Sequence, residues 1–465
     1  MKIAFVTFGC RLNRAESLDL EARYRTAGHE IIDLGSVPQP SQSSGTVPKT
    51  SGTVPILTGS IPDLILVRGC SVTAKAQRDC EKAIAHLRTQ FPTAEVRPIG
   101  CLPNAGTVPT LGTVPKNVGT VPTKNVCPPL QTSRAYLKIQ DGCNGKCTFC
   151  IVPHFRGQPV SIPFDEIMVR AKSFLAAGYR EIILTGCNLS LYHWSDHNLA
   201  TLLAALAELG TDPGVLGTDP RILGTDPGVL GTDPEIFLTK LRSVPQTGGP
   251  RSCAADSCLQ TGSVPARIRI GSLEPGPWCD NILDVMEKHP NICRSLHLSL
   301  QSGSNRILKR MNRPYEITWA ERFCSAARER LGTDLALGAD IITGFPGETE
   351  EDFEATRAFL ERHAFSNLHV FPYSERPGTP AATMDGALPR AVRLARAREL
   401  TALGHRQRET FAQTFLGREV EVCVERGGEH GWTSAYLPCK WKGPAERRSL
   451  VRKRIIAVDG DTLLA

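Results

Sequence analysis

The chain has 465 residues, of which 41% are hydrophobic, so it is long enough for several domains and can bury more than one core. Its 54 lysine and arginine residues exceed its 47 aspartate and glutamate residues, for a net charge of +7. This mild excess is compatible with RNA as a polyanionic partner, and equally with a slightly basic protein that binds no nucleic acid.

No run of about 18 apolar residues occurs, so we expect no membrane span. The opening residues MKIAFVTFG are typical of a buried strand rather than of a secretion signal. Sixteen cysteines in such a chain favour metal binding over disulfides and indicate a reducing compartment. We therefore expect a cytoplasmic protein.

The first region, residues 1–125, alternates strand and helix patterns. KIAFVTF and PDLILVRG are apolar strand segments, and ESLDLEARYRTAG and AQRDCEKAIAHLRTQF are amphipathic helical segments. This alternation predicts an open, parallel α/β domain.

The same alternation continues over residues 132–383, with short apolar strands such as EIILTG, ARIRIGS, SLHLSLQ and ALGADIITG. It predicts a partial (β/α) barrel. A basic helix is expected over residues 384–416. The tail, residues 417–465, alternates like a small antiparallel β domain, and we predict an all-β barrel there.

Short Pro- and Gly-containing repeats interrupt these regions. Pro and Gly in every unit exclude a continuous helix, so we interpret the repeats as low-complexity loop insertions that are poorly ordered and not catalytic. GTVP begins at Gly45, Gly52, Gly106, Gly112 and Gly119, and GTDP begins at Gly210, Gly217, Gly224 and Gly231.

Three cysteines, Cys143, Cys147 and Cys150, stand together in CNGKCTFC, just past a predicted strand. Three thiolates on a four-iron, four-sulfur (4Fe-4S) cluster leave one iron free to bind a small chelating molecule. Zinc would require a fourth ligand, for which His154 is a nearby candidate. The position beyond a strand, where barrel active sites gather, favours iron and sulfur over zinc.

Cys10, Cys70 and Cys101 each follow an apolar strand, in FVTFGC, ILVRGC and VRPIGC. Successive strands of a parallel sheet end side by side, so the three thiols can converge although they are far apart in the chain. We predict a second cluster at these three residues. Nine cysteines show no partner pattern and are interpreted as structural or incidental: Cys80, Cys127, Cys253, Cys258, Cys279, Cys293, Cys324, Cys423 and Cys439.

The C-x3-C-x2-C motif resembles that of radical S-adenosylmethionine enzymes. TFGCRLNRAES, GCSVTAKAQRDC and IGCLPN are similar to the N-terminal blocks of the methylthiotransferases within that class. HVFPYSERPGTPAATM is most similar to the block of the tRNA threonylcarbamoyladenosine methylthiotransferases. One departure is Arg68-Gly69-Cys70, where the family usually has Asn-Thr-Cys.

The resemblance implies two 4Fe-4S clusters and S-adenosylmethionine as cofactors, with no catalytic residues beyond the cluster ligands. It also suggests cofactor or substrate contacts at strand ends: Thr185 and Gly186 in EIILTGCNLSLY, Ser272 and Glu274 in RIRIGSLEP, and Ser299, Gln301, Ser302 and Arg313 in HLSLQSGSNRILKRMNRPY. Alternation places Ser299 and Gln301 on the lumen face of their strand, and Leu298 and Leu300 on the other face. Glu350, Glu351 and Asp352 are interpreted as first-turn charges of a helix.

The function implied is addition of a methylthio group to carbon two of threonylcarbamoyladenosine at position 37 of tRNA. The partners implied are a tRNA anticodon stem-loop and a reducing electron donor. The basic tail, with KWKG and RRSLVRKR, is the expected RNA-binding β barrel, similar to a TRAM domain. Two alternatives remain: the same chemistry on isopentenyladenosine, and a non-catalytic, zinc-bound tRNA-binding module. HWSDH, residues 193–197, is expected to be a loop rather than a zinc site.

Overall fold

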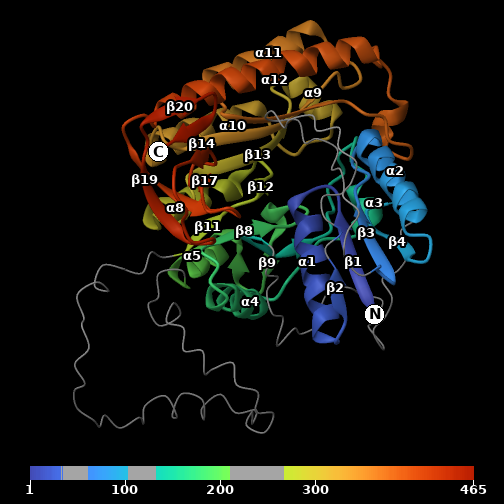
Figure 1. The fold of residues 1–465 in the computed structure, drawn as a ribbon. Helices are drawn as coiled ribbons and strands as arrows, with labels where there is room; N and C mark the ends of the chain where they lie inside the picture. The colour runs from blue at the N-terminus through green and yellow to red at the C-terminus, as the bar shows by residue number, and fades with distance from the viewer. Residues whose placement is uncertain (33, 35–60, 103–131, 210–265) are drawn as a thin grey trace.

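The computed structural model describes residues 1–32, 34, 61–102, 132–209 and 266–465 (Figure 1). The GTVP and GTDP repeats, together with Cys127, Cys253 and Cys258, lie outside the described residues, so the predictions about them stay predictions. Within the described ranges, no helix is long and apolar enough to span a membrane.

The N-terminal region is a four-stranded parallel sheet covered by one helix on each face (Figure 1). Ile3, Leu64 and Leu66 pack against α1, and alternate residues such as Ala4 and Val67 pack against α2. The strands lie in the order β2-β1-β3-β4. The elements are β1 (Lys2–Thr7), α1 (Arg11–Thr26), β2 (Glu30–Ile32), β3 (Leu64–Gly69), α2 (Ala74–Gln90) and β4 (Glu95–Gly100).

The central region is a partial barrel of parallel strands that neighbour one another in chain order. One sheet has the order β11-β8-β5 and the next has β12-β13-β14-β15, and a parallel bridge between Ile268 and Ile292 joins them. The strands are β5 (Ala135–Lys138), β8 (Glu181–Thr185), β11 (Arg267–Arg269), β12 (Ser272–Leu273), β13 (Ser295–Gln301), β14 (Ala336–Thr343) and β15 (Asn367–Pro372). The parallel α/β character expected from the sequence is confirmed.

Helices cover the outside of this barrel. They are α3 (Val152–Arg156), α4 (Phe164–Ala176), α5 (Leu199–Leu209), α8 (Asp280–Lys288), α9 (Asn305–Arg310), α10 (Ile317–Leu331) and α11 (Glu350–Arg362). Two short antiparallel pairs lie between them: β6 (Gln140–Asp141) with β7 (Val160–Ser161), and β9 (His193–Trp194) with β10 (His197–Asn198). The prediction of a plain loop at HWSDH is therefore wrong: Ser195, at φ +50°, turns it into a small hairpin.

Alternation along the strands separates the outer core from the lumen. Leu298 and Leu300 of β13 are fully buried in the main apolar core, while the exposure of Ser299 and Gln301 is intermediate. The same period along β14 buries Ala339 and leaves Asp340 on the opposite face.

The tail folds into one six-stranded sheet with the order β19-β16-β17-β18-β21-β20. Its two edge strands are joined only by Ile455 and Ile456. The edges of a flat sheet of this size would lie roughly 24 Å apart, whereas this link spans about 10 Å, so the sheet must curl on itself. The strands are β16 (Glu419–Val424), β17 (His430–Thr433), β18 (Pro438–Lys440), β19 (Leu450–Arg454), β20 (Ala457–Asp459) and β21 (Thr462–Leu464). The β18–β21 pair is parallel, which corrects the wholly antiparallel expectation.

The basic helix α12 (Arg390–Gln413) lies along β15 and joins the barrel to the tail (Figure 1). Arg396 is buried and pairs with Glu348 and Glu350. Part of the positive charge of this helix therefore serves packing rather than an outside partner.

Candidate active site

The CNGKCTFC loop brings three cysteine thiols to the lumen side of the barrel. A Cβ atom on Gly145 would lie 3.2 Å from Cys143 Sγ and 3.7 Å from Cys147 Sγ, so both sulfurs crowd this glycine. The Gly145 amide donates to Cys143 Sγ (3.3 Å). Burial, reinforced by the neighbouring Cys147 and Cys143, raises the pKa of Cys150 to about 11. Cys150 is therefore a poor nucleophile by itself, and a bound metal centre would be needed to hold it as a thiolate.

Among the described residues, neither cysteine trio forms the compact ligand set expected of a single metal ion. Among the described residues, three ligand atoms come within 4.8 Å of one another only at His297, Asp340 and His369, and at neither cysteine trio. One tetrahedral zinc would hold its sulfurs about 3.8 Å apart. A cubane carries each cysteine on a different iron, which requires a wider spacing.

Arg313 and Glu274, two of the candidate contact residues, form an ion pair beside this loop. Arg313 Nη1 lies 3.0 Å from Cys147 Sγ, and Nη2 lies 3.0 Å from Glu274 and donates to the Ser299 carbonyl (3.1 Å). Asn188, which sequence inspection missed, donates to Glu274 (2.6 Å) and also interacts with Cys143. A carboxylate, a guanidinium and an amide therefore surround the thiols and could hold a charged cofactor.

The other predicted contact residues are less close to the loop. Thr185 is buried at the end of β8, and a Cβ on Gly186 would lie 3.0 Å from two Gln140 oxygens, so this glycine makes room for Gln140. Ser272 is exposed on β12. Gln301 adopts φ +68° at an irregularity between β13 and β14.

Ser302 serves the protein's own structure rather than the site. Its buried hydroxyl accepts from the Ser304 amide (3.2 Å) and lies 3.4 Å from the Thr356 hydroxyl. The interpretation of Asp352 as a simple first-turn charge was incomplete: it forms a capping box with Thr349, accepts from Ser304 (2.6 Å) and pairs with Arg306.

The second trio follows three neighbouring strands, as predicted from the repeated strand-Gly-Cys pattern. Cys10 follows β1, and the buried Cys70 and Cys101 follow β3 and β4. Burial raises the pKa of Cys70 to about 12, and the nearby Cys10 and Cys101 add to the rise. Gly9 has φ +97°, and a Cβ there would lie 2.7 Å from Cys70 Cβ, so only glycine fits without strain.

Asn13 braces the loops that carry this trio. Its side-chain amide donates to the Phe8 carbonyl and to the Gly69 carbonyl, both at 2.9 Å. These bonds tie the segment before Cys10 to the segment before Cys70. Cys80 lies beside Cys70, and its Sγ accepts a hydrogen bond from the Cys70 backbone amide (3.4 Å).

One arginine, Arg156, connects the two cysteine regions. It follows the CNGKCTFC loop in α3, and its Nε donates to Cys101 Sγ (3.1 Å). Its terminal nitrogens contact Asn13 (2.9 Å), Glu16 (2.8 Å) and Asp141 (3.0 Å). Its side chain is only 9% exposed, so all these contacts lie in the interior.

Glu16 is the centre of this network, which we call the bridging network: Glu16, Arg68, Lys138, Asp141 and Arg156. Glu16 accepts from Arg68 (2.8 Å), Lys138 (2.7 Å) and Arg156. Burial alone would raise its pKa, but these three charges lower it to about 2. Arg68, the departure from the family's usual residue, thereby gains a role as a partner of Glu16.

Sequence inspection missed this network because it joins helices and loops from distant parts of the chain. The available signal was that Glu16 and Arg156 stand within a few residues of predicted cluster cysteines. Cys187, also an unexpected residue, donates to Asp141 (3.2 Å), and burial raises its pKa far above the ordinary range. It is therefore a thiol at neutral pH.

Comparisons with known proteins agree with this geometry. The Radical SAM superfamily model matches residues 137–360. The chain is 28% identical to the threonylcarbamoyladenosine tRNA methylthiotransferase MtaB of Bacillus subtilis, over 95% of this chain and 90% of that protein. It is 27% identical to the protein of the same name from Aquifex aeolicus, over 97% and 99% of the two chains.

A tRNA-2-methylthio-N(6)-dimethylallyladenosine synthase of Mycobacterium sp. (strain MCS) is 34% identical over 63% of this chain and 49% of its own. Among solved structures, the radical S-adenosylmethionine methyltransferase TsrM from Kitasatospora setae aligns with a TM-score of 0.47 and 13% identity, over 82% of this chain and 77% of that one. The chain contains a radical S-adenosylmethionine domain over residues 137–360. The relatives that it matches over nearly their whole length are methylthiotransferases, which indicates an enzyme that transfers sulfur-containing groups.

Proposed function

We propose that this enzyme adds a methylthio group to carbon two of threonylcarbamoyladenosine at position 37 of tRNA, beside the anticodon. The observation that supports the proposal is the bridging network, in which Arg156, from the helix that follows the cysteine loop, donates to Cys101 of the second trio and to Glu16. A radical enzyme that also transfers sulfur requires two such centres within reach of one substrate.

The residues present fit a 4Fe-4S cluster on each trio, with S-adenosylmethionine on the free iron of the first. When bound, these groups would supply the carbon radical that an unactivated aromatic C–H requires. Arg313 and Glu274 would orient the cofactor beside Cys147 and Cys143. The bridging network would hold Cys101 at a fixed distance from the barrel mouth. A reducing electron donor and a cytoplasmic location belong to the same proposal.

The choice of tRNA rests on the printed functions of the relatives and on the tail. Arg452 is 77% exposed on β19, where Arg454 is also exposed. Arg448, by contrast, donates to Thr132 and Ala177 carbonyls and serves packing. The exposed basic strip is therefore smaller than the sequence predicted, but it is present on the curled sheet that resembles an RNA-binding barrel.

Two alternatives carry different expectations. The same chemistry on isopentenyladenosine is favoured by the Mycobacterium relative, which shares more identity over a shorter stretch. A zinc-bound module without catalysis would require a fourth ligand at a cysteine trio, and would hold zinc in place of iron.

The test is nucleoside mass spectrometry of tRNA incubated with anaerobically reconstituted enzyme, S-adenosylmethionine and a reductant. We expect a methylthio product on tRNA that carries threonylcarbamoyladenosine, and none with Cys150→Ala. Product on isopentenyladenosine alone would assign the first alternative. No product on either tRNA, from protein that holds both clusters, would contradict the proposal.

A further inference from the structure

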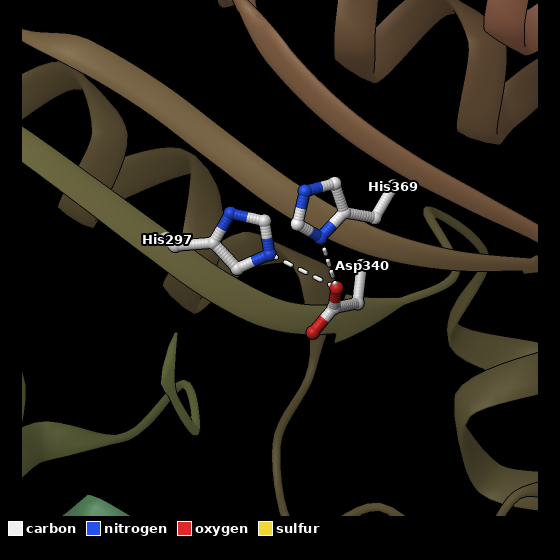
Figure 2. A group of neighbouring side chains, drawn as sticks. All are labelled: His297, Asp340 and His369. Carbon is white, nitrogen blue, oxygen red and sulfur yellow. Dashed lines mark hydrogen bonds and ion pairs between the residues drawn. The ribbon is translucent and has the colours of Figure 1, made fainter. Parts of the chain in front are cut away.

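His297, Asp340 and His369 form a compact polar group inside the barrel (Figure 2). They come from three neighbouring strands, β13, β14 and β15, and their side chains point toward one another. His297 Nε2 lies 3.0 Å, and His369 Nδ1 3.2 Å, from the same oxygen of Asp340, Oδ1. The mechanism described above uses none of the three.

The position of this group follows from what lies further along the same strands. Two residues beyond Asp340, Ile342 packs against the same apolar cluster as Phe149 of the cysteine loop. Two residues beyond His297, the Ser299 carbonyl accepts from Arg313, which contacts Cys147. Residues two apart on a strand face are separated by about 7 Å. The group therefore lies one layer below the cysteine loop, at the floor of the lumen.

A small cavity of about 20 Å³ lies beside His297 and is also lined by Arg11, Asn367 and Tyr436. Arg11 stands over the Tyr436 ring at 5.2 Å and hydrogen-bonds the Tyr436 side chain, and among the described residues it forms no ion pair. A Cβ on Gly338 would lie 2.4 Å from His297 Nδ1, so a glycine is needed for the ring to lie there.

These side chains retain hydrogen-bonding capacity that the protein itself does not use. Both histidines bond the same Asp340 oxygen, and within the described part of the chain its other oxygen has no partner. The side chain of His369 is 45% exposed, which leaves its second nitrogen accessible. An apolar group placed here would remove water from a carboxylate, imidazoles and a guanidinium without replacing those hydrogen bonds, which disfavours its binding.

We propose that Arg11, His297, Asp340 and His369, the polar floor, bind the side group on the target base, and that this group carries hydroxyl, amide and carboxylate functions. The inference rests on the proposed function and deepens it: such a floor fits threonylcarbamoyl and rejects dimethylallyl. Arg11 would face the carboxylate of the threonylcarbamoyl group. The free oxygen of Asp340 and the free nitrogen of His369 would form hydrogen bonds with its hydroxyl and N–H groups.

A divalent metal is the competing occupant, because two histidines and a carboxylate are also a common metal-binding set. Two observations favour the side group. One nitrogen of each histidine already bonds Asp340 Oδ1, so a metal held by this oxygen would have to replace both bonds. Arg11 is close enough that its charge contributes to lowering the pKa of His297, after the larger effect of burial, and a nearby cation disfavours a second one.

The test measures binding rather than turnover. Fluorescence anisotropy would give the Kd of the anaerobic holoenzyme for three anticodon stem-loops, carrying threonylcarbamoyladenosine, isopentenyladenosine or unmodified adenosine. We expect wild type to prefer the first over the second by about tenfold or more, since a site built for polar groups rejects an analogue that lacks them. His369→Phe and Asp340→Leu should bring this ratio near one without weakening the unmodified stem-loop, and His369→Gln should retain most of the preference.

The matched control is His86→Phe, on the exposed face of α2, which should leave the ratio unchanged. Iron content and circular dichroism establish that each variant is folded. A ratio unchanged in His369→Phe and Asp340→Leu would overturn the inference, as would a wild-type preference for isopentenyladenosine, although that result would keep the enzyme a tRNA methylthiotransferase. One zinc per chain, retained by wild type and lost in His369→Phe, would assign the floor to a metal instead. No binding of any stem-loop would remove the proposed function and the inference with it.

Discussion

The two cysteine trios reach similar arrangements by opposite routes. Cys143, Cys147 and Cys150 belong to one short loop, in which the lack of a side chain at Gly145 leaves room for the sulfurs of Cys143 and Cys147. Cys10, Cys70 and Cys101 come from the ends of three strands of a parallel sheet. The first trio depends on local sequence, whereas the second depends on the order of strands in the sheet.

Their surroundings differ as well. The loop trio meets Arg313, Glu274 and Asn188, side chains that can hold a small charged molecule. The strand-end trio receives a hydrogen bond from Arg156, whose other donors are occupied by the bridging network. We infer that the loop trio is built to bind a cofactor, and the strand-end trio to be held rigidly against it.

The largest expected effect separates the two trios by the step that each supports. Cys150→Ala should abolish cleavage of S-adenosylmethionine and product formation together. Cys101→Ala should retain cleavage but yield no methylthiolated nucleoside. Chromatography of 5′-deoxyadenosine and nucleosides measures both, and Cys324→Ala, in the core of the barrel, should lose neither. Equal loss of cleavage in Cys101→Ala and Cys150→Ala would break the distinction.

The free energy of unfolding should fall more when an ion pair in the core of the barrel is lost than when one between the N-terminal region and the barrel is lost. Glu181 is fully buried and pairs with Arg267 (2.6 Å) and Arg269 (2.8 Å). Glu181→Gln would leave two buried guanidinium groups without their counter-charge, so we expect unfolding free energy to fall by about 3–5 kcal/mol. Urea unfolding measures this, with the exposed Glu354→Gln as a control that should behave like wild type. A small loss in Glu181→Gln would mean that the backbone carbonyls of the tail, which also accept from these arginines, hold them without it.

Glu16→Gln should act less on stability and more on the link between the regions. Because the folded pKa of Glu16 is about 2 against its ordinary value of 4.5, its stabilisation is present above about pH 4.5 and is lost as the pH falls toward 2. A shift of this size corresponds to about 3 kcal/mol at neutral pH. Urea unfolding at pH 7 and at pH 4 measures the free energy of unfolding of wild type and of Glu16→Gln. The difference between the two proteins should be smaller at pH 4 than at pH 7. A constant difference would mean that Glu16 contributes by packing rather than by charge.

The smallest expected effect concerns the tail, which contributes to neither trio. Arg452→Gln with Arg454→Gln should reduce the salt dependence of tRNA binding by about two units of slope, one for each lost phosphate contact. Binding titrations over a range of salt concentrations measure this. Arg362→Gln, which removes a charge that is 61% exposed on α11, should leave the slope unchanged. An unchanged slope in the double variant would place the RNA on another surface.

The two cysteine trios could be predicted from the sequence, but the side chains around them could not be predicted from spacing alone. The loop trio can be recognised from the eight residues CNGKCTFC. The strand-end trio can be recognised from a strand-Gly-Cys pattern that occurs three times, because the strand ends of a parallel sheet meet at one edge. Arg313 and Glu274 could be selected only through the family resemblance, since nothing in their spacing indicates that they meet.

What escaped prediction depends on which elements become neighbours. In the sequence, Arg156 and Glu16 are ordinary charged residues of amphipathic segments. They meet only because α1 packs against the barrel. His297 and His369 lie more than seventy residues apart and meet only because β14 lies between their strands. The number of charges in the basic helix and tail overestimated the exposed positive charge for the same reason. Packing pairs Arg396 of the helix with Glu348 and directs Arg448 of the tail to a backbone carbonyl.

The central claim is that each trio holds its own four-iron cluster. The most direct measurement is iron and sulfide analysis of anaerobically purified protein, with zinc measured in parallel, on wild type and on two triple variants. One replaces Cys143, Cys147 and Cys150 with alanine, and the other replaces Cys10, Cys70 and Cys101. We expect about eight irons in wild type and about four in each variant. Wild type with about four irons, or with zinc in place of iron, would contradict the account.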